Sequence, residues 1–163
     1  MIVLGCDPGL SGGLAVIEAG PSQRFIGAIP VPTNGEKAKR RVDVVQMVGF
    51  LYTMKPTHAV IERAQAMPEQ GSSSGFIYGR AVGALEATIL GMQIPLTIIE
   101  PTAWKKAHGL IKRGKEDSRQ RALQLFPGRP EFARKMDHNV AEASLIAWYG
   151  IMLLRGNNNA PNR

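Results

Sequence analysis

The order of apolar runs along the chain constrains its fold more than any other feature. Three short β-prone runs come first, at residues 2–6, 14–17 and 25–29. Two further runs, at 58–61 and 96–99, then alternate with segments of helical periodicity. Because a glycine-rich turn joins the first two runs, we expect them to form a hairpin. The whole order predicts an α/β fold, a five-stranded mixed sheet flanked by helices.

Helical periodicity predicts the elements that cover this sheet. A short helix opens at Pro101, and the longer expected helices span about 42–54, 74–90, 116–126 and 137–154. Loops are predicted where polar residues gather with glycine, proline or lysine, at 30–41, 63–75 and 112–115. From the length we expect one domain over 1–155, followed by a disordered tail over 156–163.

Composition narrows the partners and the compartment. The formal charge of +7 and the sequence pI of about 9.9 favour a polyanionic partner, with nucleic acid first. The lone Cys6 excludes a disulfide framework and a cysteine-rich zinc site, and it fits a reduced cytoplasmic compartment. No apolar run approaches the ~18–20 residues that span a bilayer, so we expect no membrane partner.

Four acidic residues are placed where a catalytic site would need them. Asp7 closes the first apolar run and Glu62 closes the run at 58–61, while Asp137 and Glu142 open the last predicted helix. Two Mg²⁺ or Mn²⁺ ions roughly 3.5–4 Å apart can stabilise both oxygens of a phosphodiester displacement, and they take carboxylate ligands. These four residues therefore predict a divalent-metal nuclease site.

The start of the last helix leaves one ligand open. His138 and Glu142 are one helical turn apart and share a face, whereas Asp137 is about 140° from Glu142 on an ideal helix. Asp137 joins the site only if it lies in the approach to the helix; otherwise it caps the helix. Both roles remain possible from the sequence.

Several motifs resemble those of one nuclease family. The segment 5–12, Gly-Cys-Asp-Pro-Gly-Leu-Ser-Gly, resembles the first-strand motif of RuvC-type Holliday junction resolvases. Ile61-Glu62 resembles their second acidic position, and 137–147 resembles their C-terminal helix. Segments 100–106 and 114–116 resemble their two lysine-bearing positions. The resemblance extends over about residues 1–150 and is closest to the shorter RuvC-like proteins of phages and prophages.

The resemblance implies an RNase H-like fold and a cytoplasmic enzyme of a bacterium or a phage-infected cell. It implies a homodimer that resolves four-way DNA junctions by paired symmetrical nicks, with two Mg²⁺ or Mn²⁺ ions in each active site. The implied catalytic residues are Asp7, Glu62, Asp137, Glu142, Lys105 and Lys115. The implied metal ligands are the four acidic residues, with His138 as a substitute for Asp137. The family spacing would place a ligand at Asn139, where this chain has an amide, and the last acidic residue is Glu142 instead of aspartate.

The resemblance also suggests which residues meet DNA and which meet a second subunit. The loop 63–75 leaves Glu62 directly, so its polar residues and Met67 are placed to enter a junction. The expected DNA contacts are Arg63, Gln65, Met67, Gln70, Ser72, Ser73, Lys105, Lys106, Lys112, Arg113 and Lys115. Small residues at i, i+4 spacing along the helix 74–90 suggest the dimer interface: Gly75, Gly79, Gly83 and Ala87.

Other functions stay open beside this one. The disturbed acidic pair at 137–142 is compatible with a non-catalytic DNA-binding module, and the fold is compatible with a nuclease for other branched or hybrid substrates. Asp-Pro-Gly after a first strand also occurs in actin-like ATPases and sugar kinases, which need far longer chains. The segment 109–116 nearly matches a phosphate-binding loop, but glutamate stands where that loop has serine or threonine, so no nucleotide cofactor is expected.

Overall fold

A mixed five-stranded sheet forms the centre of the molecule. The computed structural model describes residues 1–36, 39–65 and 71–158. The strand order is β3-β2-β1-β6-β7. The strands are β1 (Ile2–Asp7), β2 (Gly13–Glu18), β3 (Arg24–Pro30), β6 (His58–Glu62) and β7 (Leu96–Ile99). The first three strands are antiparallel and the last two run parallel to β1. The predicted hairpin and the predicted five-stranded mixed sheet are confirmed.

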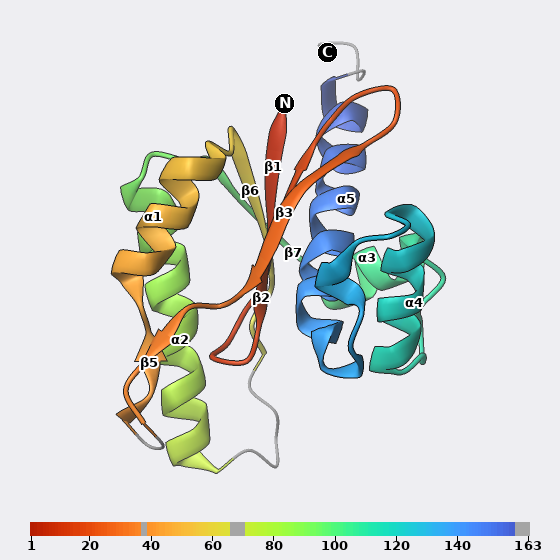
Figure 1. The fold of residues 1–163 in the computed structure, drawn as a ribbon. Coiled ribbons are helices and arrows are strands. Elements are labelled where there is room, and N and C mark those ends of the chain that lie inside the picture. Colours follow the sequence, from red (N-terminus) through yellow and green to blue (C-terminus); the bar gives the residue numbers. More distant parts are fainter. Residues whose placement is uncertain (37–38, 66–70, 159–163) are drawn as a thin grey trace.

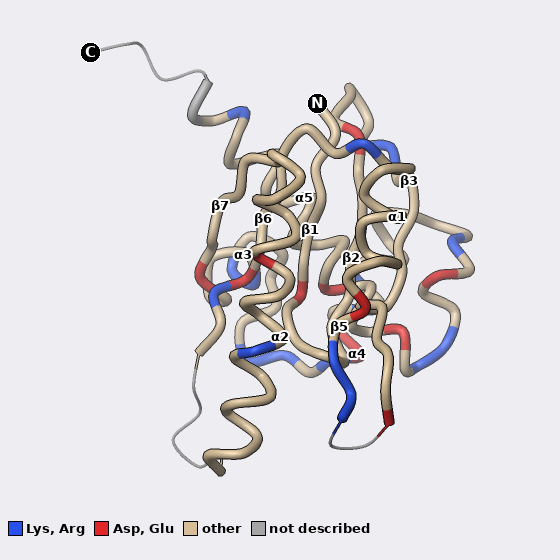
Figure 2. The backbone as a smooth tube through the Cα atoms, turned by 90° about the vertical axis from the view of Figure 1, so that its left-hand side faces the viewer, with Lys and Arg blue, Asp and Glu red and all other residues tan. Residues whose placement is uncertain are grey.

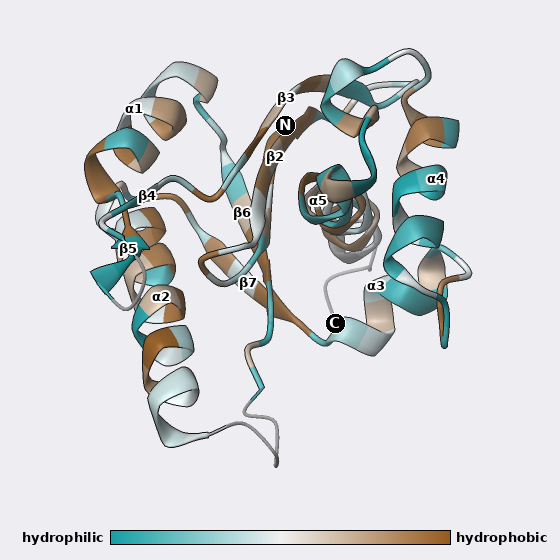
Figure 3. Ribbon diagram, turned by 60° about the horizontal axis from the view of Figure 1, so that its bottom comes forward, coloured by the Kyte–Doolittle hydropathy of each residue, from teal (hydrophilic) through white to brown (hydrophobic). Residues whose placement is uncertain are grey.

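Helices cover both faces of the sheet (Figure 1). One face carries α1 (Val44–Met54) and α2 (Ser72–Gly91). The other face carries the long helix α5, with α3 and α4 beside it; their bounds are α3 (Pro101–Ala107), α4 (Lys115–Leu125) and α5 (His138–Asn158). In Figure 3 the strands are largely hydrophobic, whereas α4 is mostly hydrophilic. The sheet therefore supplies apolar surface to both layers.

Side-chain alternation assigns each strand residue to one of these faces. On β1, Val3 lies in the core beneath α5, and Leu4 lies in the core beneath α1 and α2. On β6, Val60 lies beneath α5. Because successive side chains of a strand point to opposite faces, Asp7 and Glu62 project to the α5 side of the sheet. Both carboxylates therefore face the layer that contains the last helix.

Glycines let α5 lie directly on the sheet. A Cβ atom added at Gly5 would stand 2.1 Å from the carbonyl oxygen of Ala143, and one added at Gly13 would stand 2.5 Å from that of Asn139. Real Cβ atoms do not approach backbone so closely, so only glycine permits this contact. The close approach fixes the first turns of α5 against the ends of β1 and β2.

Some elements differ from the sequence prediction. The predicted loop 30–41 contains a two-stranded ribbon, β4 (Thr33–Asn34) paired with β5 (Arg41–Val42). Two short 3-10 helices precede α5: η2 (Pro130–Phe132) and η3 (Lys135–Asp137). Helix α5 continues to Asn158, so the first residues of the predicted disordered tail 156–163 are helical. Among the helices of the described ranges, none is long and apolar enough to cross a bilayer.

Candidate active site

Asp7 and Glu62 end neighbouring parallel strands at the same edge of the sheet. In the register of β1 and β6, Cys6 pairs with Ile61, so the next residue on each strand is a carboxylate. Both side chains are half-buried. Figure 2 shows acidic segments where β1 and β6 end and basic segments on the neighbouring backbone. The prediction that these strands would be neighbours is confirmed.

Helix α5 brings Glu142 to the same place. Glu142 and Asp7 line one cavity of about 420 Å³, together with Tyr78, Lys115 and Asn139. The close packing of α5 on Gly5 and Gly13 explains this position, because it holds the first turns of the helix over the end of β1. Residues far apart in sequence thus form one acidic cavity with a basic residue at its side.

The pKa of Asp7 reports the crowding of this site. Burial raises this pKa well above its usual value, and the negative charges of Glu142 and Glu62 raise it further. The positive charges of Lys115 and Lys105 act in the opposite direction. Like charges that gather in a partly buried site are costly unless cations compensate them. The cluster is therefore electrostatically prepared for cations.

Glu62 is restrained by a tryptophan. The indole Nε1 of Trp104 donates a hydrogen bond of 2.6 Å to Glu62 Oε2. Burial raises the pKa of Glu62, while the bond from Trp104 and the charge of Lys105 lower it. Glu142 is restrained in a similar way, because Ser118 Oγ donates to Glu142 Oε1 at 3.0 Å. Each glutamate therefore has one oxygen already occupied by a side-chain donor.

Two of the predicted basic residues accompany the carboxylates. Lys105 is half-buried on α3, and its Nζ lies 5.3 Å from the centroid of the Trp104 ring. Lys115 is the first residue of α4 and lines the acidic cavity. Lys106, Lys112 and Arg113 are exposed on the same basic segment. Lys115 therefore brings positive charge to the cavity wall, and the rest of this segment is exposed and basic.

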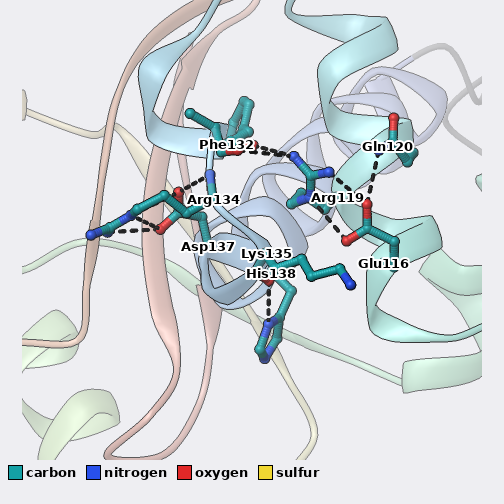
Figure 4. Close-up of polar contacts among 9 residues, drawn as sticks. Glu116, Arg119, Gln120, Phe132, Arg134, Lys135, Asp137 and His138 are labelled. Atoms are coloured by element: carbon teal, nitrogen blue, oxygen red, sulfur yellow. Dashed lines mark hydrogen bonds and ion pairs between the residues drawn. The ribbon is translucent and has the colours of Figure 1, made fainter.

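Asp137 does not line the acidic cavity and is instead paired with Arg134, as Figure 4 shows. Its Oδ1 accepts a hydrogen bond of 2.8 Å from Arg134 Nη2, and its Oδ2 accepts one of 2.8 Å from the Arg134 backbone N–H. Burial alone would raise the pKa of Asp137, but these bonds and the charge of Arg134 lower it overall. Asp137 ends η3 and lines a neighbouring cavity, so its described partner is Arg134 and not the other carboxylates.

Asn139, the position that the family spacing indicates, lies in the acidic cavity, whereas the predicted ligands Asp137 and His138 do not line it. Asn139 is three residues before Glu142, on the same face of α5, and lines the acidic cavity. Its Nδ2 donates to the carbonyl oxygen of Ser11, so Oδ1 is the atom of this amide that can act as a ligand. The His138 ring contacts the carbonyl oxygen of Lys135 at 3.2 Å and is not part of the cavity wall.

The loop after Glu62 is described only at its ends. Arg63 forms an ion pair with Glu100, and Gln65 Nε2 lies 3.5 Å from Glu100 Oε2. Ser72 and Ser73 are exposed at the start of α2. The predicted DNA contacts Met67 and Gln70 lie outside the described residues.

The small residues of α2 face away from the sheet. Cβ atoms added at Gly75, Gly79 or Gly83 would meet nothing within 4 Å. Gly79, Gly83 and Ala87 are exposed, and Phe76 and Leu90 on the same helix are 70% and 56% exposed. Packing within the subunit therefore does not account for this surface.

The donor set of the cavity suits a hard divalent cation. Asp7, Glu142 and Asn139 supply carboxylate and amide oxygens to the cavity, and Glu62 ends the adjacent strand; such oxygens are the ligands that Mg²⁺ and Mn²⁺ prefer. Over residues 1–36, 39–65 and 71–158, no three acidic, histidine or cysteine side chains already converge on one metal position.

Comparison with solved structures defines the fold. The chain is similar to Thermus thermophilus RuvC in complex with a Holliday junction substrate, with a TM-score of 0.73 and 22% identity over 96% of this chain and 97% of that one. A second T. thermophilus RuvC structure gives a TM-score of 0.69 at 22% identity, again over 96% and 97%. The yeast mitochondrial Holliday junction resolvase Ydc2 gives 0.50 at 14% identity, over 96% of this chain and 83% of that one.

These likenesses establish an RNase H-like fold of the RuvC type, as the sequence motifs indicated. No protein-family model matches the sequence. No curated protein matches it in a sequence search.

Some residues of the site were not predicted as members. None of Trp104, Ser118 and Tyr78 was among the predicted site residues. Trp104 is fully buried, and its N–H donates to Glu62. A buried indole always needs an acceptor for its N–H, and this requirement was the available signal. Ser118 and Tyr78 carried no comparable signal in the sequence.

Proposed function

We propose that this protein is a metal-dependent endonuclease that resolves four-way DNA junctions. The observation that carries the proposal is the acidic cavity: Asp7 and Glu142 share it, and Glu62 ends the adjacent strand, on a RuvC-type fold. The T. thermophilus RuvC that shares this fold is in complex with a Holliday junction substrate. The net charge of +7 supports a nucleic-acid substrate.

The proposed ligands of two Mg²⁺ or Mn²⁺ ions are Asp7, Glu62, Glu142 and the amide oxygen of Asn139. When bound, such ions activate a water molecule as the nucleophile and stabilise the attacking and leaving oxygens. Asn139 replaces Asp137 and His138 in this proposal, because Asp137 is paired with Arg134 and neither residue lines the cavity.

The chain's own cations and donors do the remaining work. Lys115, at the cavity wall, stabilises negative charge that develops on the phosphate. Lys105 lies over the Trp104 ring, near enough for its charge to lower the pKa of Asp7, and it holds the scissile strand. Exposed basic residues on either side contact the flanking phosphates; these are Lys106, Lys112 and Arg113. At the start of α2, Ser72 and Ser73 are donors for the same backbone.

Paired symmetrical nicks need two copies of the site. We propose a homodimer in which the exposed α2 surface, with Gly79, Gly83 and Ala87 between Phe76 and Leu90, meets its own copy. A two-fold interface repeats the same patch on both subunits, so the two cavities would face opposed strands of a four-fold symmetric junction.

The decisive experiment compares Glu62→Gln with the unaltered protein. Each is incubated with Mg²⁺ and a four-way junction, a plain duplex or an RNA–DNA hybrid. We expect paired nicks in the junction and their loss in the variant, because the amide is a poorer metal ligand. The matched control is Glu18→Gln, since Glu18 ends a strand at the opposite edge of the sheet, opposite Ile2. Equal cutting of all three substrates would reject junction specificity.

A second candidate is a junction-binding protein without cleavage activity. It is favoured by the fact that, in the described residues, no three candidate side chains already converge on a metal. Junction binding with no cutting at any Mg²⁺ or Mn²⁺ concentration would support this candidate and reject the nuclease.

A further inference from the structure

The position of Trp104 follows from the strand register. Glu62 pairs with Ile99 at the ends of β6 and β7, and α3 begins two residues later at Pro101. The backbone N–H of Arg63 donates to the carbonyl oxygen of Ile99 at 2.7 Å, which keeps the two chain exits together. The first turn of α3 therefore lies beside Glu62, and the side chain of Trp104 points towards that carboxylate.

The contact between Trp104 and Glu62 is a specific one. Trp104 is 0% exposed, and its single N–H donates to Glu62 Oε2 at 2.6 Å. The face of the same ring lies under the Lys105 ammonium. A buried indole could donate to any backbone carbonyl, but here it donates to a candidate metal ligand. One side chain thus restrains a carboxylate and a cation of the site.

Ser118 has the equivalent position for the other glutamate. It is 3% exposed on α4, and its hydroxyl donates to Glu142 Oε1 at 3.0 Å. A serine hydroxyl on a neighbouring helix restricts the rotamers that Glu142 can adopt. The segment 101–125, which contains α3 and α4 and which we call the α3–α4 arm, therefore donates to both glutamates.

The α3–α4 arm is itself tied to α5. His108, at the end of α3, is buried, and its Nε2 lies 3.0 Å from the carbonyl oxygen of Leu145. Leu145 is one turn beyond Glu142 on α5. The His108 ring also packs edge-on to Trp104, with centroids 6.5 Å apart. A shift of the arm would therefore move both donors relative to both glutamates.

We propose that Trp104 and Ser118 are positioning residues. Trp104 holds one carboxylate oxygen of Glu62 and Ser118 holds one of Glu142, so that the other oxygen of each glutamate is presented to a divalent cation. This inference rests on the proposed function only in assigning the two glutamates as metal ligands. Outer partners of this kind orient the ligands and reduce the entropy that metal binding costs. The α3–α4 arm then sets metal affinity as well as contacting DNA.

The test measures Mn²⁺ binding to the full-length protein without DNA, by the electron paramagnetic resonance signal of free Mn²⁺. Trp104→Phe keeps an aromatic ring and removes the N–H, and we expect about tenfold weaker binding. Ser118→Ala removes one neutral donor, and we expect about threefold weaker binding. The matched controls are Trp148→Phe, a half-buried tryptophan that packs on Phe126, and Ser144→Ala, a buried serine that donates to Val140 O.

Loss of packing must be separated from loss of the N–H. Replacement of Trp104 by benzothienylalanine, in a Trp148→Phe background, preserves the ring shape and has sulfur in place of the N–H. We expect this isostere to weaken Mn²⁺ binding as much as Trp104→Phe does, while its thermal unfolding matches the background protein. Wild-type Mn²⁺ affinity in the isostere would overturn the role of Trp104.

The positioning role and the proposed junction-cutting activity can be rejected independently of each other. If both variants bind Mn²⁺ within about twofold of the unaltered protein, or if the unaltered protein binds no Mn²⁺, the positioning role is rejected. If the variants lose affinity as expected but the unaltered protein cuts no junction, the positioning role stands and the proposed activity is rejected. Restoration of nicking in Trp104→Phe by high Mn²⁺ would support the positioning role directly.

Discussion

Glycines serve opposite purposes on the two sides of the sheet. On the α5 side, Gly5 and Gly13 are points where the helix backbone touches the strand backbone, and no larger residue fits. On the α2 side, Gly75, Gly79 and Gly83 have open space around them. The same residue type therefore builds the interior of one layer and the outer surface of the other.

The two layers of helices differ in what they contribute to the molecule. The α5 layer contains the acidic cavity and the aromatic cluster of Phe25, Phe126 and Phe132, with ring centroids 5.2–6.3 Å apart. The α1–α2 layer buries a largely aliphatic core and exposes the glycines of α2, with Phe76 and Leu90, outside it. One layer positions the carboxylates, and the other leaves the outer surface of α2 exposed.

The largest expected effect tests the inward glycines. Gly5→Ala would place a methyl group 2.1 Å from the Ala143 carbonyl oxygen, so α5 would have to move away from β1. We expect a loss of about 3 kcal/mol in the free energy of unfolding, measured by urea denaturation. A loss below about 1 kcal/mol would contradict the close contact.

A smaller effect on stability comes from the buried carboxyl group of Asp7. The pKa of Asp7 is raised by burial and by Glu142 and Glu62, so the folded state holds this proton more tightly than the unfolded state. Stability therefore falls as pH rises from the unfolded pKa through the raised folded pKa. Asp7→Asn should increase the free energy of unfolding at neutral pH by about 1 kcal/mol while abolishing cleavage. Destabilisation of metal-free protein at neutral pH would refute this explanation.

His108 gives the α5 layer a second pH dependence, of opposite sign. Its pKa is lowered from 6.5 by burial and by the charge of Arg121, against the raising effect of the bond to Leu145. The folded state then binds a proton at His108 less tightly than the unfolded state does. The stability that neutral His108 contributes is complete above pH 6.5, and it is lost as the pH falls below that value. His108→Gln should flatten the dependence of the melting temperature on pH in this range.

His58 is the matched control for this measurement. Its pKa is also lowered by burial, but it lies less deeply, beside Thr97 at the far end of β6. His58→Gln should flatten the same curve less than His108→Gln does. An equal or larger effect at His58 would remove His108 as the main source.

The smallest expected effect tests the outward glycines. Gly79→Ala meets no atom in the subunit and improves helix propensity, so the isolated subunit should gain about 0.5 kcal/mol. If this surface forms the dimer, the added methyl groups should raise the dimer dissociation constant in sedimentation experiments. A stable dimer with unchanged affinity would remove the glycine surface from the interface.

Much of the fold could be predicted because the chain marks its regular elements clearly. The predicted strand at 96–99 coincides with β7, and the other strands differ from their predictions by a residue or so at each end. The ribbon of β4 and β5 was missed because two-residue strands show no periodicity. Helix α5 was expected to stop before Gly156, but this glycine is accommodated in its last turns.

The different surroundings of Asp137 and Asn139 could not be predicted because they depend on how the chain enters α5. A 3-10 turn ends at Asp137, and Arg134 in the preceding turn provides a partner for that carboxylate. The helix then begins at His138 and lies against Gly13, which puts Asn139 at the cavity. The spacing of residues in the sequence does not show that Asp137 has an arginine partner or that Asn139 faces the cavity.

The separation of the carboxylates along the chain also has a consequence for synthesis. Glu142 leaves the ribosome about 135 residues after Asp7, which is on the order of 10 s later at ordinary translation rates. Until α5 has formed and docked on Gly5, the first two carboxylates have no third partner. Under the proposed function, a nascent chain would therefore emerge without a complete cleavage centre, and it would not cut DNA until the last helix is in place.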